Sequence, residues 1–226
     1  ELRVVTVLFA TFSPTALGDH PVPPDEANRL IDAPLCRTDE LVRRHGGTVL
    51  RRFADGIMAV FGAPSARGDD AACAVRAALE IRDGCGCSCR ADGQRDVAVR
   101  AGLATGRVVA GQMRAGEETG YGVVGQAVTL ARRLEGLGTE GSVLLCAETQ
   151  VQVRGRFRIR AIESPSTPPG DTRLPTYEVL DEHPHGLVVP PREVLGARPP
   201  MVGRDVEIAQ LKALLDRTVS DSSPQV

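Results

Sequence analysis

Short apolar runs of strand length recur along this chain, mostly in pairs, and amphipathic helical periods separate the pairs. The first run, residues 4–10, is uninterrupted and rich in β-branched side chains, as in a buried strand. A helical period over residues 25–45 follows, and then the runs 48–53 and 56–61 predict a hairpin. Hairpins that alternate with helices predict an α+β domain, in which helices pack on one mostly antiparallel sheet.

The second half of the chain continues this alternation. A turn at Thr105-Gly106 is expected to join strands over residues 97–104 and 107–113, and a polar loop is expected at 114–119. The remaining expected elements are helices over residues 69–82, 127–137 and 147–153 and strands over residues 142–146, 156–162 and 175–180.

The composition changes after the first 180 residues, which are expected to form one domain. Residues 181–200 contain five prolines and show no helical or strand period, so they are predicted to be a linker. An amphipathic pattern then resumes, with Asp205 as the expected N-cap of a helix. Residues 201–226 are therefore expected to begin another domain.

Composition excludes several classes of partner. The formal net charge is -2 and the isoelectric point is about 6.1, so no basic field exists to hold nucleic acid or an anionic membrane. No apolar run approaches the roughly 20 residues of a membrane span. We therefore expect a cytoplasmic protein with no nucleic-acid or membrane partner. Cys85, Cys87 and Cys89 have a poor spacing for zinc and are expected to be free thiols.

Four segments carry the motifs that indicate a function. They are residues 7–15 (VLFATFSPT), 45–62 (HGGTVLRRFADGIMAVFG), 101–111 (AGLATGRVVAG) and 121–135 (YGVVGQAVTLARRLE). Their order and spacing resemble the catalytic domain of class III nucleotidyl cyclases, over about residues 2–180. The resemblance implies a ferredoxin-like βαββαβ core. Residues 199–207 (PPMVGRDVE) resemble the entry to the ATPase domain that follows such a module in bacterial regulators.

The resemblance also implies a ligand and an assembly. In this family two domains pair head to tail, and two aspartates of one domain hold two divalent ions, Mg²⁺ or Mn²⁺. The partner domain supplies an asparagine, an arginine and usually a lysine. A lysine with an aspartate or threonine reads adenine, whereas a glutamate with a cysteine reads guanine. The expected ligand is ATP or another purine nucleotide, and the expected assembly is a homodimer or a heterodimer with another cyclase domain.

The metal positions of the family are only half retained. The second aspartate corresponds to Asp55 at the hairpin tip, and the first corresponds to Thr11, directly after the strand at 4–10. A threonine hydroxyl is a poor ligand for a hard dication. Phe12, in the same motif, corresponds to a substrate-binding position. Pro14 stands in or near the turn where the family has glycine, and proline has no N–H group to donate to a phosphate.

The positions that contact the nucleotide are changed as well. Those that read the base correspond to Arg51 and Gly122, and the asparagine that orients the ribose corresponds to Thr129. The arginine that stabilises the transition state is retained as Arg133. The triphosphate lysine has no counterpart, because the corresponding segment, residues 163–175, contains no lysine.

Three functions therefore remain open. The leading hypothesis is a catalytically impaired domain that senses a nucleotide or dimerises within a larger regulator and needs no cofactor. The alternatives are an active, divergent adenylate cyclase that uses Mg²⁺ or Mn²⁺, and a scaffold that dimerises without a ligand. Two residues also fit plainer roles: Asp55 suits a tight Asp-Gly turn, and Arg133 suits a surface position that pairs with Glu135.

Overall fold

The computed structural model describes residues 1–14, 23–87, 97–115, 118–162 and 174–183, together with the helical Gln210 and Ala213. The chain divides into two units, residues 1–189 and 190–226. Most of the predicted linker and of the helical segment expected after it lies outside the described residues, so both stay predictions. None of the described helices combines the length and the apolar character that a membrane span requires.

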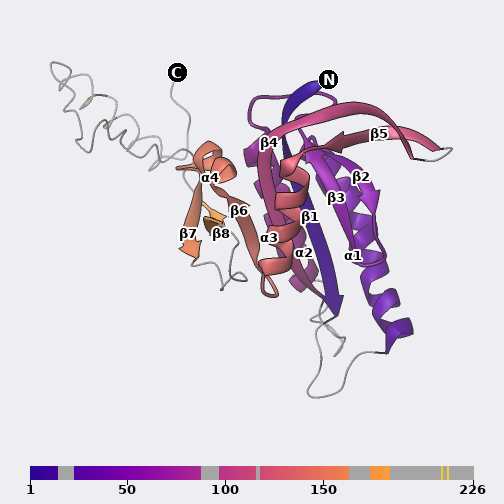
Figure 1. The fold of residues 1–226 in the computed structure, drawn as a ribbon. Helices are drawn as coiled ribbons and strands as arrows, with labels where there is room; N and C mark the ends of the chain where they lie inside the picture. Colours follow the sequence, from indigo (N-terminus) through magenta and orange to yellow (C-terminus); the bar gives the residue numbers. More distant parts are fainter. Residues whose placement is uncertain are drawn as a thin grey trace. The chain divides into compact units, whose positions relative to one another are not determined.

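An eight-stranded sheet forms the centre of the first unit (Figure 1). Its strands are β1 (Leu2–Pro14), β2 (Thr48–Arg52), β3 (Gly56–Phe61), β4 (Val97–Ala115), β5 (Glu118–Val124), β6 (Val143–Cys146), β7 (Phe157–Ile162) and β8 (Thr176–Glu182). The described helices are α1 (Pro24–Arg44), α2 (Asp70–Cys87), α3 (Gln126–Leu137) and α4 (Ala147–Val153). The strands pair in the order β2-β3-β1-β4-β6-β8-β7, and β5 pairs with β4.

This sheet confirms the predicted α+β architecture. Among the described strand pairs, only β4 and β6 run parallel, and the others are antiparallel. The elements from β1 to β4 follow one another as strand, helix, strand, strand, helix and strand, and their strands lie in the order β4-β1-β3-β2. This is the ferredoxin-like core that the resemblance implied.

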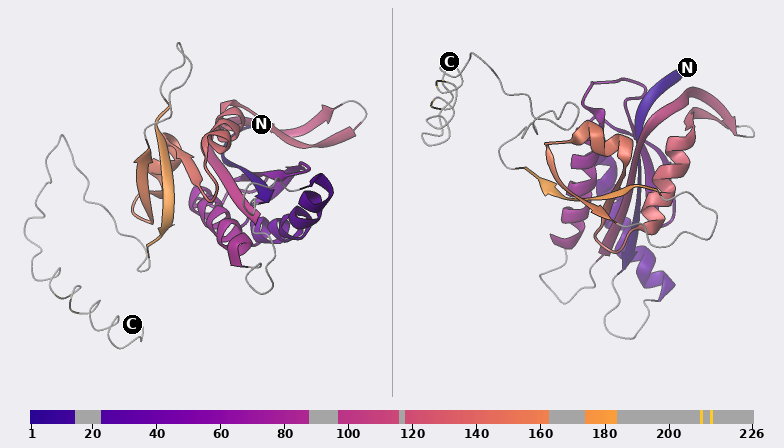
Figure 2. Two further views of the ribbon diagram at one scale, coloured as in Figure 1. Left: turned by 90° about the horizontal axis from the view of Figure 1, so that it is seen from below. Right: turned by 60° about the vertical axis from the view of Figure 1, so that its left-hand side comes forward.

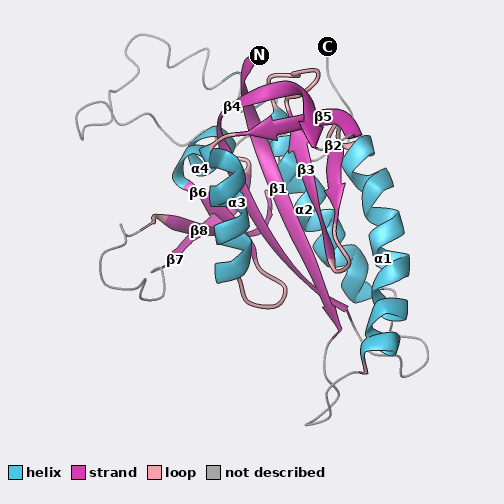
Figure 3. Ribbon diagram, turned by 45° about the vertical axis from the view of Figure 1, so that its right-hand side comes forward, coloured by secondary structure: helices cyan, strands magenta, loops and turns pink. Residues whose placement is uncertain are grey.

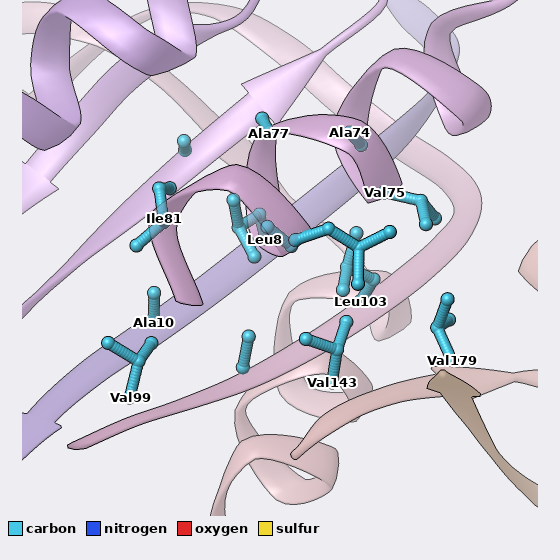
Figure 4. Packing of buried hydrophobic residues seen from close by; sticks show 14 of the residues in the cluster. Leu8, Ala10, Ala74, Val75, Ala77, Ile81, Val99, Leu103, Val143 and Val179 are labelled. Atoms are coloured by element: carbon cyan, nitrogen blue, oxygen red, sulfur yellow. The ribbon is translucent and has the colours of Figure 1, made fainter. Parts of the chain in front are cut away.

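Side-chain alternation along β1 divides the interior into two apolar clusters. Leu8 and Ala10 belong to the cluster beneath α1 and α2, where they lie near small side chains of α2 such as Ala77 (Figure 4). Val7 and Phe9 belong to the cluster beneath α3. Helices α1 and α2 thus cover one face of the sheet, and α3 covers the other (Figures 2 and 3).

Strand β4 is continuous through Thr105 and Gly106, so the turn predicted there is wrong. Strand β1 pairs with β4 along its whole length, and Gly106 lies opposite Val5 in extended backbone. The Thr105 side chain is buried, and its hydroxyl lies 2.9 Å from the hydroxyl oxygens of both Thr6 and Thr149. Pairing with β1 and this buried hydrogen-bond network together override a two-residue turn signal.

Two neighbouring expectations are corrected in the same region. Strand β1 continues to Pro14 instead of ending at residue 10, because β3 and β4 flank it and satisfy its backbone groups. The loop expected at 114–119 is largely strand, since β4 reaches Ala115 and β5 begins at Glu118. Together β4 and β5 extend beyond the sheet as a two-stranded ribbon (Figure 1).

Candidate functional site

Thr11 and Asp55 lie side by side at one end of the sheet. Thr11 pairs with Gly56, the first residue of β3, and Asp55 directly precedes that residue. The Phe12 N–H donates a 2.7 Å hydrogen bond to the carbonyl oxygen of Asp55. The Asp55 side chain is exposed, and that of Thr11 is half-buried. The structure therefore brings together the two residues that correspond to the metal positions.

The hairpin tip that carries Asp55 is pressed against β1 at Gly56. A Cβ atom on Gly56 would lie 2.3 Å from the carbonyl oxygen of Ala10. The Phe53 N–H closes the turn with a 2.7 Å hydrogen bond to the Gly56 carbonyl oxygen. Only glycine permits this close approach of two backbones, so the Asp-Gly sequence itself fixes Asp55 next to Thr11.

The side chain of Phe12 lies in the core, and the expected role of this residue in substrate binding stays a prediction. It is 1% exposed and packs in the cluster beneath α1 and α2. Successive residues of a strand point to opposite sides of the sheet, which places Phe12 away from the Thr11 side chain. Pro14 is the last residue of β1 and pairs with Val97, and the segment that follows it lies outside the described residues.

A pocket of about 510 Å³ lies on the α3 side of the sheet, next to the β2–β3 hairpin. Two of the predicted residues line it, Arg51 from β2 and Thr129 from α3. Its volume falls within the range of small-molecule sites in proteins. The described residues that line it are Phe9, Arg51, Phe53, Met58, Val123, Val128, Thr129 and Arg132.

Gly122 and Arg133 are not among the residues that line this pocket. A Cβ atom on Gly122 would lie 3.0 Å from the sulfur of Met113, whereas the next residue, Val123, faces the pocket. Arg133 is half-buried and lies one helical turn after Thr129 on α3. The roles carried over to these two residues remain predictions.

Arg132 is a pocket residue that the sequence analysis missed. Its guanidinium lies 5.5 Å from the ring centroids of both Phe9 and Phe53. The two rings stack with a centroid distance of 6.2 Å and an interplanar angle of 19°. The faces of aromatic rings attract cations, so the two rings hold the guanidinium at the pocket. The sequence could have indicated Arg132, because it follows Thr129 by three residues on a predicted helix and residues three apart on a helix are neighbours.

Arg52, the neighbour of Arg51, anchors β2 to α1. Its guanidinium pairs with the Asp39 carboxylate, which also accepts a 3.3 Å hydrogen bond from Arg43. Asp39 is 9% exposed, whereas the Arg52 side chain is half-exposed, so water screens this pair in part. Because neighbouring strand residues point to opposite faces, an Arg52 held at α1 leaves Arg51 on the α3 side, where the pocket lies.

Helix α3 lies against β4 without a side chain between the two backbones. A Cβ atom on Gly102 would lie 2.3 Å from the Ala131 carbonyl oxygen and 2.3 Å from the Glu135 nitrogen. This approach fixes the height of α3 above the sheet. It therefore also fixes the backbone positions of Thr129 and Arg132.

The donor set at Thr11 and Asp55 does not fit a pair of divalent ions. Across the described ranges, no group of three or more His, Cys, Asp or Glu side chains could hold a metal ion. Asp55 offers one carboxylate and Thr11 a neutral hydroxyl, whereas hard dications prefer carboxylate and carbonyl oxygens. The segment expected to hold a triphosphate-binding cation, residues 163–175, is described only for its last two residues.

Residues 1–179 match the profile of the adenylate and guanylate cyclase catalytic domain. The chain belongs to this cyclase family. The cyclase domain is 28% identical over 162 residues to Adenylate cyclase 1 of Rhizobium meliloti. This match covers 70% of this chain and 24% of the relative. An adenylate cyclase of Mycobacterium tuberculosis is 29% identical over 155 residues, or 69% of this chain and 34% of the relative. The chain thus spans about a quarter to a third of the length of these relatives.

Solved structures share the fold of the cyclase domain. The adenylyl cyclase CyaB from P. aeruginosa has a TM-score of 0.72 at 23% identity, over 81% of this chain and 97% of that chain. The guanylate cyclase domain of RhGC from Catenaria anguillulae, in complex with GTP, has a TM-score of 0.69 at 23% identity, over 81% of this chain and 100% of that chain. At these identities the likeness establishes the fold.

Proposed function

We propose that this cyclase domain binds a purine nucleotide but cyclises it poorly, and that it serves as a nucleotide-sensing or dimerising module of a larger regulator. The observation that carries the proposal is the juxtaposition of Thr11 and Asp55, which offers one carboxylate at a position where the family uses two. The pocket lined by Arg51 and Thr129 is formed nevertheless. Binding and chemistry can therefore separate in this domain.

The size of the expected loss supports impairment. Removal of one transition-state donor in an enzyme typically costs about 10²–10³ in rate. Here Thr11, Thr129 and the absent triphosphate lysine all depart from the family pattern. The effects of residues in one site are not additive, so their factors are not multiplied. The direction is a large loss of turnover.

The proposed assembly is a homodimer or a heterodimer with another cyclase domain. In the head-to-tail pairing of the family, Asp55 of one domain would face Thr129 and Arg133 of its partner. A guanylyl cyclase domain of the RhoGC fusion protein from Blastocladiella emersonii, which is similar to this chain at 21% identity, is described both as a non-canonical dimer and as a monomer, so the oligomeric state of this chain needs its own measurement. The expected cytoplasmic location stays a prediction.

Mass-spectrometric detection of cyclic AMP and cyclic GMP tests the proposed impairment. The purified chain is incubated at high concentration with ATP or GTP and Mn²⁺, beside Asp55→Ala and a sample without protein. We expect no product above the sample without protein. Product that forms with the wild-type chain and disappears in Asp55→Ala would overturn the proposal.

An active, divergent adenylate cyclase is the second candidate. It is favoured by the presence of Asp55 and Arg133 and by the adenylate cyclase names of the bacterial relatives. In that case ATP would yield cyclic AMP and pyrophosphate, and Arg133→Ala would abolish the product. A retained rate in Arg133→Ala would exclude this candidate.

A further inference from the structure

Among its described residues, the pocket beside α3 offers hydrogen-bond donors and no carboxylate. Its lining combines two guanidinium groups, of Arg51 and Arg132, with the hydroxyl of Thr129. The other lining side chains are apolar: Phe9, Phe53, Met58, Val123 and Val128. A guanidinium presents five N–H donors and no acceptor. The side chains of the pocket therefore suit a ligand that presents acceptors.

Both guanidinium groups are available to such a ligand. Arg132 contacts the faces of Phe9 and Phe53, and such contacts leave N–H groups at the edge of the guanidinium unused. Within the described part of the chain, neither Arg51 nor Arg132 forms an ion pair with a carboxylate. This differs from Arg52, whose guanidinium is engaged by Asp39.

The apolar part of the lining favours a flat heterocycle over a phosphate group. A phosphate that entered among five apolar side chains would lose much of its hydration, which is costly for a charged group. A heteroaromatic ring loses little by the same transfer and gains contact with the phenylalanine rings. The base of a nucleotide therefore fits the pocket better than its phosphates do.

We infer that this pocket recognises a 6-oxopurine base, guanine or hypoxanthine, through Arg51 and Arg132, and discriminates against adenine. The inference rests on the proposed function, because it assumes that a purine nucleotide binds. Guanine presents two adjacent acceptors, N7 and O6, whereas adenine presents the acceptor N7 and the amino donor at position 6. An arginine donates two parallel hydrogen bonds to two adjacent acceptors. Opposite adenine, one of its N–H groups would meet the amino group, which is also a donor, and that hydrogen bond could not form.

Gly122 strengthens the discrimination. It corresponds to a base-reading position of the family, but it carries no side chain, and a Cβ atom there would face Met113. No side-chain carboxylate from this position can accept a hydrogen bond from the adenine amino group. The 2-amino group of guanine gains no carboxylate either, so hypoxanthine should be recognised as well as guanine.

Calorimetric titration of the full chain with GTP, ITP, ATP and 7-deaza-GTP, each with Mg²⁺, tests this inference. We expect GTP and ITP to bind about tenfold or more tightly than ATP, the range that one bidentate pair supplies. The analogue 7-deaza-GTP lacks the N7 acceptor and should lose most of this advantage.

Two variants assign the discrimination to residues. Arg51→Gln and Arg132→Gln each replace a donor-only group by an amide that can also accept, so both should bring the affinities for GTP and ATP closer together. Arg154→Gln, at an exposed position after α4, is the matched control and should leave the ratio unchanged. Circular dichroism and thermal unfolding establish that each variant is folded.

The outcomes are distinct. Equal or tighter binding of ATP overturns the inference and leaves the proposed nucleotide binding intact. A GTP preference that survives both glutamine variants also overturns it, since the base would then be read elsewhere. Tighter GTP binding by Arg132→Gln would show that Arg132 blocks the pocket. If no nucleotide binds at all, the proposed function fails and the inference fails with it.

Discussion

At the scale of single residues, the carboxylate that is missing beside Asp55 can be restored by a substitution at Thr11. The two residues adjoin through the Phe12–Asp55 backbone hydrogen bond, so Thr11→Asp would place a second carboxylate beside the first. Combined with Thr129→Asn, it should raise cyclic nucleotide formation with Mn²⁺ to at least about ten times the level of the sample without protein, which is less than the factor of about 10²–10³ that one such group typically supplies.

The control for that repair is Thr11→Asn combined with Thr129→Asn. Asparagine resembles aspartate in size but lacks its charge, so this double variant should remain at the level of the wild-type chain. Equal activity of the two double variants, measured by mass spectrometry of the product, would show that the missing carboxylate is not what limits turnover.

Gly56 should tolerate no larger residue. The added Cβ atom of Gly56→Ala would lie 2.3 Å from the Ala10 carbonyl oxygen, so β1 and the hairpin must move apart. We expect a loss of about 1–3 kcal/mol in the free energy of unfolding, as in other overpacked sites. Urea unfolding measures it, with Gly111→Ala as the control because nothing lies within 4 Å of its added atom. Equal stability of the two variants would contradict the close approach.

The sequence indicated some residues of the candidate site and missed others. The motif spacing singled out Thr11, Asp55, Arg51 and Thr129 because local sequence patterns carry these positions. Arg132 escaped, since its contacts with Phe9 and Phe53 join three segments that only the fold brings together. The burial of the Phe12 side chain was not predicted for a similar reason, because the face to which it points depends on how far the strand extends.

At the scale of elements, a charge cluster ties the end of α1 to α2. Glu80 on α2 pairs with Arg44 and with His45, whose Nε2 lies 2.7 Å from a carboxylate oxygen of Glu80. Its hydrogen bond with Arg44, followed by that with His45, lowers the pKa of Glu80. This cluster therefore stabilises the folded state when Glu80 is ionised.

Loss of that charge should show a definite pH dependence. Because the pKa of Glu80 is lowered in the folded state, its contribution is complete above about pH 4.3, the ordinary pKa of glutamate, and fades as the pH falls through the lowered value. Glu80→Gln should lower the free energy of unfolding at pH 7 by about 0.2–1 kcal/mol, as for exposed pairs. The difference from wild type should shrink toward acid pH in urea titrations. Glu140→Gln, at an exposed position, should show neither effect.

The lengths of the elements were harder to predict than their kinds. Helical periods predicted α1, α2 and α3 from their own residues. Thr105-Gly106 carried the local signal of a turn, but the pairing of β4 with β1 kept it extended. The ends of β1 and the start of β5 likewise depend on partner strands that no local pattern reveals.

At the scale of the whole molecule, a bound nucleotide should raise the thermal stability of the domain. A ligand that binds only the folded state adds about 2.7 kcal/mol at 100 times its dissociation constant. For a domain of this size that corresponds to a rise in Tm of about 5–10 °C. Differential scanning calorimetry with GTP and ATP measures it. No shift with either nucleotide would favour a ligand-free scaffold.

The overall architecture was accessible from the sequence because it depends on the order of elements more than on their ends. Hairpins that alternate with helices can bury their apolar faces in few ways, and the antiparallel sheet with helices on both faces is one of them. The pocket was not accessible in this way. Its walls come from β1, β2, β3, β5 and α3, so its shape exists only once the sheet is complete.

The contact of α3 with β4 at Gly102 limits how this domain can pass on a signal. Because the two backbones are in contact, α3 cannot move closer to the sheet without a clash. If a nucleotide binds at Thr129 and Arg132 as proposed, we expect it to rearrange side chains and not to draw α3 closer to the sheet. A signal passed to another domain would then depend on which side chains the outer surface of α3 presents, and not on a displacement of the helix toward the sheet.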